Sequence, residues 1–179
     1  MTQAPIPPIL YTKRCRLDRI ILHDIDMLRD IVEDSQFRLY MPELYEVVHD
    51  VEGIHRFLHS FDTYAQKGEG CLWGIWKDTY LIGFVAIMDL SYDPTVFYAI
   101  HREYRNKGYA KEVVAEVVAH YRTTSKTPLH TEVYLLNRAS LAVLAFCGFK
   151  IVDNIDNKIL LKLQDELTFR KKSFNLCKK

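Results

Sequence analysis

The residues best suited to chemistry lie in one short stretch, residues 104–110, which reads YRNKGYA. It follows a strand-like run at residues 95–100 and precedes apolar residues that recur at helical spacing from 110 to 121. A strand that turns directly into a helix leaves the first backbone N–H groups unpaired, at the positive end of the helix dipole. Because positions 108 and 110 are small and positions 105 and 107 are basic, the stretch predicts a site for a phosphate or diphosphate.

Two better-known phosphate motifs are missing from the chain. Neither G-x-x-x-x-G-K-[ST] nor G-x-G-x-x-G occurs in the sequence. A basic turn before a helix is also a common solvated cap. The stretch alone therefore leaves open whether it binds a ligand.

Length and charge limit what the whole chain can be. Its 179 residues suit one domain, with a core at about residues 10–163 and a basic tail at 164–179. A formal net charge of +1 gives no reason to expect nucleic acid or a membrane as a partner. The longest apolar run, residues 81–88, is too short to span a bilayer, and no secretory signal is evident. We expect a cytoplasmic protein, as a monomer or a homodimer.

Cysteines and histidines give no sign of a metal site. The four cysteines, at positions 15, 71, 147 and 177, are scattered and form no C-x-x-C pair, which favours reduced thiols over a disulfide framework. His55 and His59 are four residues apart on a predicted helix, but no third ligand accompanies them. We therefore expect no bound metal.

Hydrophobic periodicity predicts the element order β-α-α-β-β-β-α-β-α-β-β. Residues 35–50, which contain Met41-Pro42, are expected to form a loop. This order predicts an α/β (α+β) domain with a central mixed, mostly antiparallel sheet of about seven strands and about four flanking helices. The predicted strands are residues 10–20, 71–76, 81–89, 95–100, 130–135, 149–152 and 158–163.

Four motifs together resemble the GNAT superfamily of N-acetyltransferases, over roughly residues 10–163. Residues 105–110 match its R/Q-x-x-G-x-G/A signature. Residues 12–17 (TKRCRL) and 81–85 (LIGFV) resemble two strands of the subgroup that acetylates ribosomal-protein N-termini. Residues 137–140 (NRAS), followed by CGF at 147–149, resemble the element after that family's fifth strand.

The resemblance implies a fold, a cofactor and a reaction. In the GNAT fold the fourth and fifth strands splay apart, and acetyl-coenzyme A (acetyl-CoA) lies in the gap. The implied activity is direct attack of a primary amine, from a protein N-terminus or a small molecule, on acetyl-CoA in a ternary complex. The alternative is a non-catalytic acyl-CoA-binding or sensor module of the same fold. The implied cofactor-binding residues are Tyr98, Ala99, Ile100, Arg105, Asn106, Lys107, Gly108, Tyr109, Ala110, Asn137 and Ser140.

The resemblance also suggests candidates for acid and base. One family location for a glutamate base is occupied here by Thr95, but a second holds Glu132, where burial in a strand would suit proton acceptance. Relatives often place a tyrosine acid at the position of Leu144. Ser140 is then the candidate donor to the thiolate, with Tyr134 or no acid as alternatives. The structural alternatives are a salt-bridged Glu132 and helix-capping roles for Ser140 and Asn137.

The amine acceptor is expected to enter beside residues 35–50 and the second helix. Tyr40, Met41 and Tyr45 are candidate substrate-binding residues, and Glu43 and Glu46 would suit a cationic acceptor. A surface loop with no binding role is the alternative. The sequence leaves the identity of the acceptor open.

Overall fold

The structure is a computed structural model that describes residues 7–164. Residues 1–6 and 165–179 lie outside the described residues. They include Cys177 and all but the first residue of the predicted basic tail. The elements, in chain order, are β1 (Leu10–Tyr11), β2 (Arg16–Asp18), η1 (Leu22–Asp24), α1 (Ile25–Val32), α2 (Ser35–Tyr40), α3 (Pro42–Val48), α4 (Val51–Lys67), β3 (Cys71–Lys77), β4 (Tyr80–Met88), β5 (Thr95–Ile100), η2 (Arg102–Tyr104), α5 (Tyr109–Thr124), β6 (His130–Tyr134), α6 (Arg138–Phe146), β7 (Phe149–Ile155) and β8 (Lys158–Leu163).

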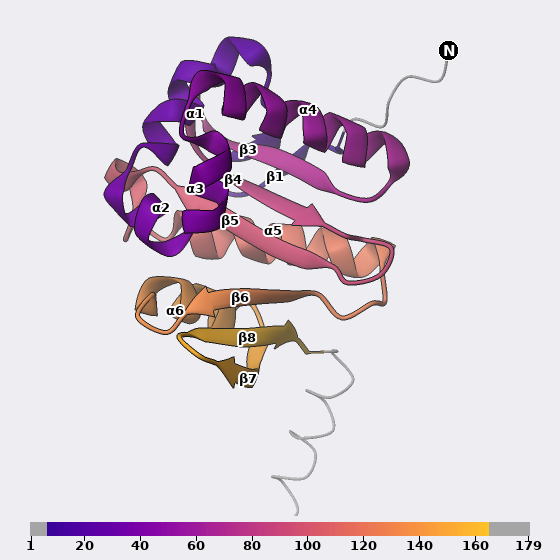
Figure 1. The fold of residues 1–179 in the computed structure, drawn as a ribbon. Helices are drawn as coiled ribbons and strands as arrows, with labels where there is room; N and C mark the ends of the chain where they lie inside the picture. The colour runs from indigo at the N-terminus through magenta and orange to yellow at the C-terminus, as the bar shows by residue number, and fades with distance from the viewer. Residues whose placement is uncertain (1–6, 165–179) are drawn as a thin grey trace, which may run out of the picture.

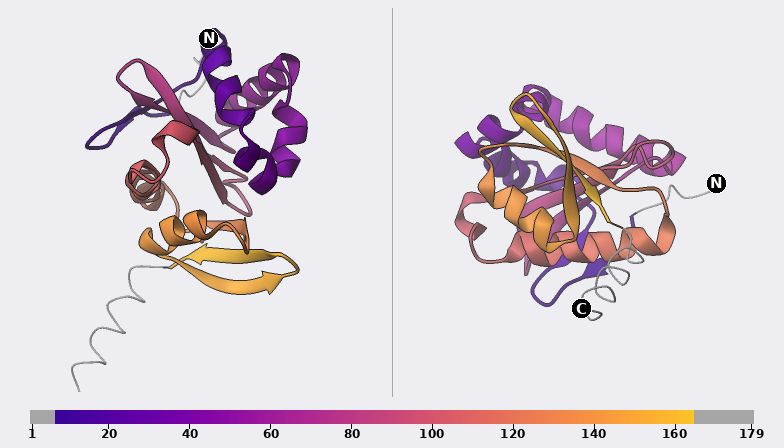
Figure 2. Two further views of the ribbon diagram at one scale, coloured as in Figure 1. Left: turned by 90° about the vertical axis from the view of Figure 1, so that its left-hand side faces the viewer. Right: turned by 90° about the horizontal axis from the view of Figure 1, so that it is seen from below.

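One sheet of eight strands, in the order β1-β2-β3-β4-β5-β6-β8-β7, divides the molecule into two layers of helices (Figure 1). Its central strands, β3 and β4, are nearly continuous apolar runs because both of their faces are buried. Trp73 and Ile75 pack with α5 and α6, whereas Leu72 and Phe84 pack with α1, α2 and α4 on the opposite face. Figure 2 shows α5 and helices α1–α4 on opposite sides of the sheet.

The sheet opens between β5 and β6. These strands are parallel, and the single pair in their register, within the described chain, is Thr95 opposite His130. Every other neighbouring pair of strands is antiparallel. The predicted mixed, mostly antiparallel sheet that splays in the middle is therefore confirmed.

Two expectations about the N-terminal half were wrong. Residues 10–20 form a hairpin of two short strands, closed by Thr12 N–H donating to the Cys15 carbonyl at 2.9 Å, so the sheet has eight strands. Residues 35–50 are two short helices, which brings the number of α-helices in the described chain to six. Asp34 caps the first by accepting from Gln36 N–H at 2.9 Å, and Pro42 stands in the first turn of the second, where its missing N–H is tolerated.

Candidate active site

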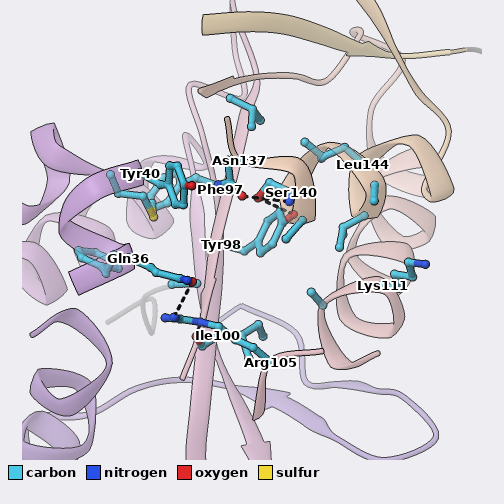
Figure 3. Close-up of a pocket in the computed structure, with 18 of the residues that line it drawn as sticks. Gln36, Tyr40, Phe97, Tyr98, Ile100, Arg105, Lys111, Asn137, Ser140 and Leu144 are labelled. Atoms are coloured by element: carbon cyan, nitrogen blue, oxygen red, sulfur yellow. Dashed lines mark hydrogen bonds between the residues drawn. The ribbon is translucent and has the colours of Figure 1, made fainter. Parts of the chain in front are cut away.

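An open cavity of about 540 Å³ lies where β5 and β6 diverge (Figure 3). Its lining comes from β5, β6, α2, α6 and the loop before α5. Of the predicted site residues, the lining includes Tyr98, Ala99, Ile100, Arg105, Asn106, Gly108, Tyr109, Ala110, Glu132, Asn137, Ser140, Tyr40 and Met41. Lys107 and Tyr45 are not among the residues that line it.

The loop before α5 presents unpaired backbone donors to the cavity. Asn106 and Gly108 adopt left-handed conformations, with φ of 59° and 83°, and no side chain caps the helix. The first N–H bonded within the helix is that of Glu112, which donates to the Gly108 carbonyl at 3.2 Å. The N–H groups of residues 109–111 therefore precede the helical ladder, at the positive end of the dipole. This arrangement suits an anion such as a diphosphate.

Arg105 holds the loop in place through three protein acceptors. Its Nε donates to the Ile100 carbonyl at 2.9 Å, and its two Nη atoms donate to Gln36 Oε1 at 2.9 Å and Asp34 Oδ1 at 2.8 Å. Burial opposes ionisation of Asp34, but the hydrogen bonds from Arg105 and from the N–H of Phe37 hold the pKa of its carboxyl below the ordinary value. The charge of Arg105 is thus paired with Asp34 in this structure.

Arg14 is a contact of the loop that the sequence did not reveal. It comes from the β1–β2 hairpin, and its Nη1 donates to the Lys107 carbonyl at 2.9 Å. Its Nε forms an ion pair with Glu112 at 2.7 Å, and its guanidinium stacks 4.1 Å from the centre of the Tyr109 ring. The ammonium of Lys107 lies 5.7 Å from the centre of the Tyr104 ring. The hairpin therefore braces the loop from outside the cavity.

Along β5, the backbone N–H and C=O groups of every second residue point toward the gap between β5 and β6. His101 N–H donates to the Ile82 carbonyl in β4, while the Pro94 carbonyl accepts from His130 N–H on the other edge. Because the two edges alternate along a strand, the N–H groups of Tyr98 and Ile100 face β6, and that of Ala99 faces β4. Beyond the Thr95–His130 pair, no residue of a described strand pairs with the edge of β5 that faces β6.

Ser140 and Asn137 stand together at the start of α6. The Asn137 side-chain oxygen accepts from Ser140 N–H at 3.2 Å, so Asn137 is the N-cap of the helix. The Tyr98 hydroxyl donates to Ser140 Oγ at 3.1 Å across the gap (Figure 3). Burial raises the pKa of Tyr98, so its phenol is neutral. Leu144, at the position where the resemblance implied a tyrosine acid, lines the cavity and is 1% exposed.

Glu132 is not buried as expected. The side chain is 51% exposed, and Oε2 lies 3.9 Å from Lys158 Nζ. Strand alternation explains this position, because Thr131 and Val133 face the core and Glu132 faces the other way. Glu132 still lines the cavity, within reach of solvent.

On the side where the acceptor was expected, the cavity is lined by α2 and the end of β6, and no residue of α3 is among the lining residues. Tyr40 and Met41 line the cavity, whereas Tyr45 packs under Arg38, whose guanidinium is 5.0 Å from the centre of its ring. Glu43 accepts from Lys158 Nζ at 2.8 Å, and this hydrogen bond holds the pKa of Glu43 below its ordinary value. Glu43 is therefore half of an ion pair rather than a lone carboxylate, and it is not among the residues that line the cavity.

Residues 7–164 give little support for a metal site, a membrane-spanning helix or a cysteine nucleophile. No group of three or more His, Cys, Asp or Glu in that range is arranged to hold a metal ion. No helix there has the length and apolar character needed to cross a membrane. Burial raises the pKa of Cys147 to about 11, so this thiol is a poor nucleophile at neutral pH.

Comparisons with known proteins identify the family of this chain. Residues 14–150 match the model of the acetyltransferase (GNAT) domain family. A comparison with curated protein sequences gave no significant match. The chain therefore belongs to the GNAT acetyltransferase family on the strength of a match over most of its length.

Solved structures show the same fold at low sequence identity. RimJ of Mycobacterium smegmatis, in complex with a CoA disulfide, superposes with a TM-score of 0.73 at 19% identity, over 87% of this chain and 86% of that one. A ribosomal-protein alanine acetyltransferase from Vibrio fischeri gives 0.73 at 14% identity, over 89% and 98%. A microcin self-immunity acetyltransferase in complex with acetyl-CoA and AMP gives 0.70 at 12% identity, over 89% and 97%.

Proposed function

We propose that this protein is an acetyl-CoA-dependent N-acetyltransferase whose acceptor is a primary amine, in a peptide N-terminus or a small molecule. One observation carries the proposal: a single cavity connects the uncapped N-terminus of α5 to the open edge of β5. That shape suits a ligand with an anionic diphosphate at one end and an amide chain at the other. Solved relatives of the same fold hold CoA and acetyl-CoA.

The cofactor would bind mainly through backbone groups. Its diphosphate would accept from the N–H groups of residues 106–111, where Gly108 leaves room for close approach. Its pantetheine amides would pair with the β5 edge that faces β6, as an added strand does. The side-chain oxygen of Asn137 is engaged in capping α6, so its NH₂ group is the part left to donate to pantetheine.

The reaction would be a direct transfer. The neutral amine attacks the thioester carbon, the C–S bond breaks, and the sulfur leaves with the bonding electrons. The Ile100 N–H, which faces the gap, is the proposed donor to the oxyanion of the tetrahedral intermediate. Holding both reactants in one cavity supplies a large share of the rate without further chemistry.

The proton of the ammonium must be removed before or during the attack. Glu132 is the proposed base, acting through water because the carboxylate is solvent-exposed on the cavity wall. Ser140 is the proposed donor to the departing sulfur, since its hydroxyl lines the same cavity and Leu144 offers no proton.

The acceptor would approach from the side of α2. Tyr40, Met41 and Phe97 line that part of the cavity, so its wall is largely aromatic and apolar. The pairing of Glu43 with Lys158 reduces the negative charge that a cationic acceptor would meet. These contacts favour an amine whose neighbouring group is neutral or apolar.

Two residues favour a second function, that of a module that binds acyl-CoA without catalysis. Thr95, at a family position for a base, is hydrogen-bonded to the Asp93 carbonyl and to His130 Nε2. Leu144 occupies a family position for an acid. A protein of the same fold that only binds acyl-CoA would tolerate both.

Release of the CoA thiol distinguishes the two functions. Wild-type protein is mixed with acetyl-CoA and a panel of peptides with free N-termini and small amines, and the free thiol is titrated. Release that depends on an acceptor supports transfer. Tight binding of acetyl-CoA with no release for any acceptor supports the binding module instead.

A further inference from the structure

A tyrosine on one half of the open sheet contacts the helix on the other half. Tyr98 stands on β5 and Ser140 stands in the first turn of α6, 42 residues further along the chain. Their oxygens are 3.1 Å apart, and both residues line the cavity (Figure 3). The contact therefore crosses the gap in which the thioester would lie.

This hydrogen bond engages the oxygen of the serine hydroxyl. With the phenol as donor and Ser140 Oγ as acceptor, the Ser140 proton is left for another acceptor. The Ser140 N–H is engaged with Asn137, which fixes the backbone at the same residue. Over residues 7–164, Tyr98 is the one hydrogen-bond partner of the Ser140 hydroxyl, so its proton has no competing protein acceptor.

We propose that Tyr98 is a positioning residue for acyl transfer, which turns the Ser140 hydroxyl toward the sulfur of the departing CoA. This proposal rests on the proposed function. A donor held in advance toward the atom where charge develops needs no rearrangement during the reaction. The bond from Tyr98 also polarises the serine O–H, because successive hydrogen bonds strengthen one another.

The pair donates hydrogen bonds and does not transfer its protons. A phenol has a pKa of about 10 and a free thiol about 8.5, so a thiolate is too weak a base to deprotonate tyrosine. Burial raises the pKa of Tyr98 further. When the C–S bond breaks, its electron pair stays on sulfur, and Ser140 and Tyr98 keep their protons. The proton lost by the amine passes to water or Glu132 and can later neutralise the free thiolate.

This arrangement explains how the site could stabilise the leaving group with a leucine, rather than a tyrosine, at position 144. Position 144, one helical turn after Ser140, holds a buried leucine that can donate no proton. Here a tyrosine reaches the same region from the strand, with its hydroxyl joined to the serine. The missing helix tyrosine therefore need not abolish stabilisation of the leaving group.

A double-mutant cycle tests the proposal on the full-length chain. Tyr98→Phe, Ser140→Ala and the double variant are compared for kcat, for KM of acetyl-CoA and for melting temperature. Tyr121→Phe is the matched control, because Tyr121 is also buried and donates to the Thr127 carbonyl at 2.8 Å, far from the cavity. It loses a similar hydrogen bond without touching the site.

Tyr98→Phe should lower kcat about two- to tenfold and leave the KM of acetyl-CoA nearly unchanged. In the Ser140→Ala background it should have little further effect, because Tyr98 acts through the serine. Tyr121→Phe should lower melting temperature without changing kcat.

Three results would overturn the proposal. The first is an unchanged kcat in Tyr98→Phe. The second is a set of independent effects that multiply in the double variant. The third is a wild-type protein that binds acetyl-CoA but acetylates no amine, which would also defeat the proposed function. The first two leave acetyl transfer by the wild type intact.

Discussion

Thr95 lies directly opposite His130, and this pair alone joins the two halves of the sheet in register along the described strands. Their side chains are also bonded, with Thr95 Oγ1 3.1 Å from His130 Nε2. His130 Nδ1 lies 3.3 Å from an Asp93 carboxylate oxygen. The gap that holds the candidate active site starts at this point, so the pair sets where β5 and β6 begin to diverge.

Thr95→Val should therefore destabilise the fold. Valine has nearly the same shape but cannot bond His130, so the free energy of unfolding should fall by about 0.5–1.5 kcal/mol. Urea denaturation measures the change, with Thr123→Val on the exposed end of α5 as the control. A Thr95→Val protein as stable as the wild type would show that the side-chain contact adds nothing to the strand pairing.

Arg105→Met should reduce stability in a pH-dependent way. The pKa of Asp34 is depressed in the folded protein, in part by Arg105, so this interaction stabilises the fold above the unfolded-state pKa of about 3.9 and is lost as the pH falls through the folded value. The loss at pH 7 should be about 1.5–3 kcal/mol and should shrink in acid. Chemical denaturation at several pH values measures it.

The control for that series is Arg16→Met, because Arg16 pairs with Asp18 on the exposed β2 strand at 2.8 Å. An exposed pair of this kind contributes at most about 1 kcal/mol. A loss for Arg105→Met that stays the same from pH 7 to acid would contradict the assigned role of the Asp34 pair.

Local sequence signals predicted local structure well. Gly68 and Gly148 stand just after α4 and α6, and both adopt positive φ, at 68° and 92°, as glycine after a helix commonly does. Asn137 precedes α6 as its cap, one of the two roles considered for it. These outcomes depend on residues close in sequence, whose backbone chemistry is the same in any fold.

Contacts between distant segments could not be predicted in this way. The partner of Arg105 is Asp34, and nothing near either residue marks the other. The polar and aromatic residues 35–50, with Met41-Pro42, predict a loop, but Pro42 stands in the first turn of α3, where proline is well tolerated. The exposure of Glu132 depends on which face of β6 meets the core, which its own sequence does not determine.

Glu132→Gln should slow acetyl transfer. If Glu132 removes the amine proton through water, kcat at neutral pH should fall by about 10²–10⁴-fold with the affinity for acetyl-CoA nearly intact. The loss should shrink at high pH, where more of the acceptor is already a free amine. Steady-state rates across pH measure this, with Glu52→Gln at the exposed start of α4 as the control. If kcat at neutral pH is unchanged in Glu132→Gln, Glu132 is not the base, and its contact with Lys158 is its remaining role.

Lys158→Met should change the preference for the acceptor. Lys158 pairs with Glu43 at 2.8 Å and lies 3.9 Å from Glu132, so its loss leaves two carboxylates unpaired near the cavity. KM should fall for acceptors that carry a second positive charge and stay nearly constant for neutral ones. Stability should change by less than about 1 kcal/mol, since Glu43 is 67% exposed.

The control for that experiment is Lys77→Met, which removes an exposed pair with Asp78 at the β3–β4 turn. It changes the net charge of the protein equally, and neither Lys77 nor Asp78 is among the residues that line the cavity. Equal shifts in KM for the two variants would mean that net charge, rather than the Glu43 pair, governs the acceptor.

The most direct test of the central claim is acetyl transfer by Gly108→Glu beside Gly68→Glu. Both glycines have positive φ, so the backbone strain is similar, but Gly68 is at the end of α4 with open space around it. Gly108 adjoins the proposed diphosphate site, where a carboxylate would repel the phosphates. We predict that wild type and Gly68→Glu transfer labelled acetyl from acetyl-CoA to an amine, and that folded Gly108→Glu neither binds acetyl-CoA nor transfers. Normal binding and transfer by Gly108→Glu would contradict the account.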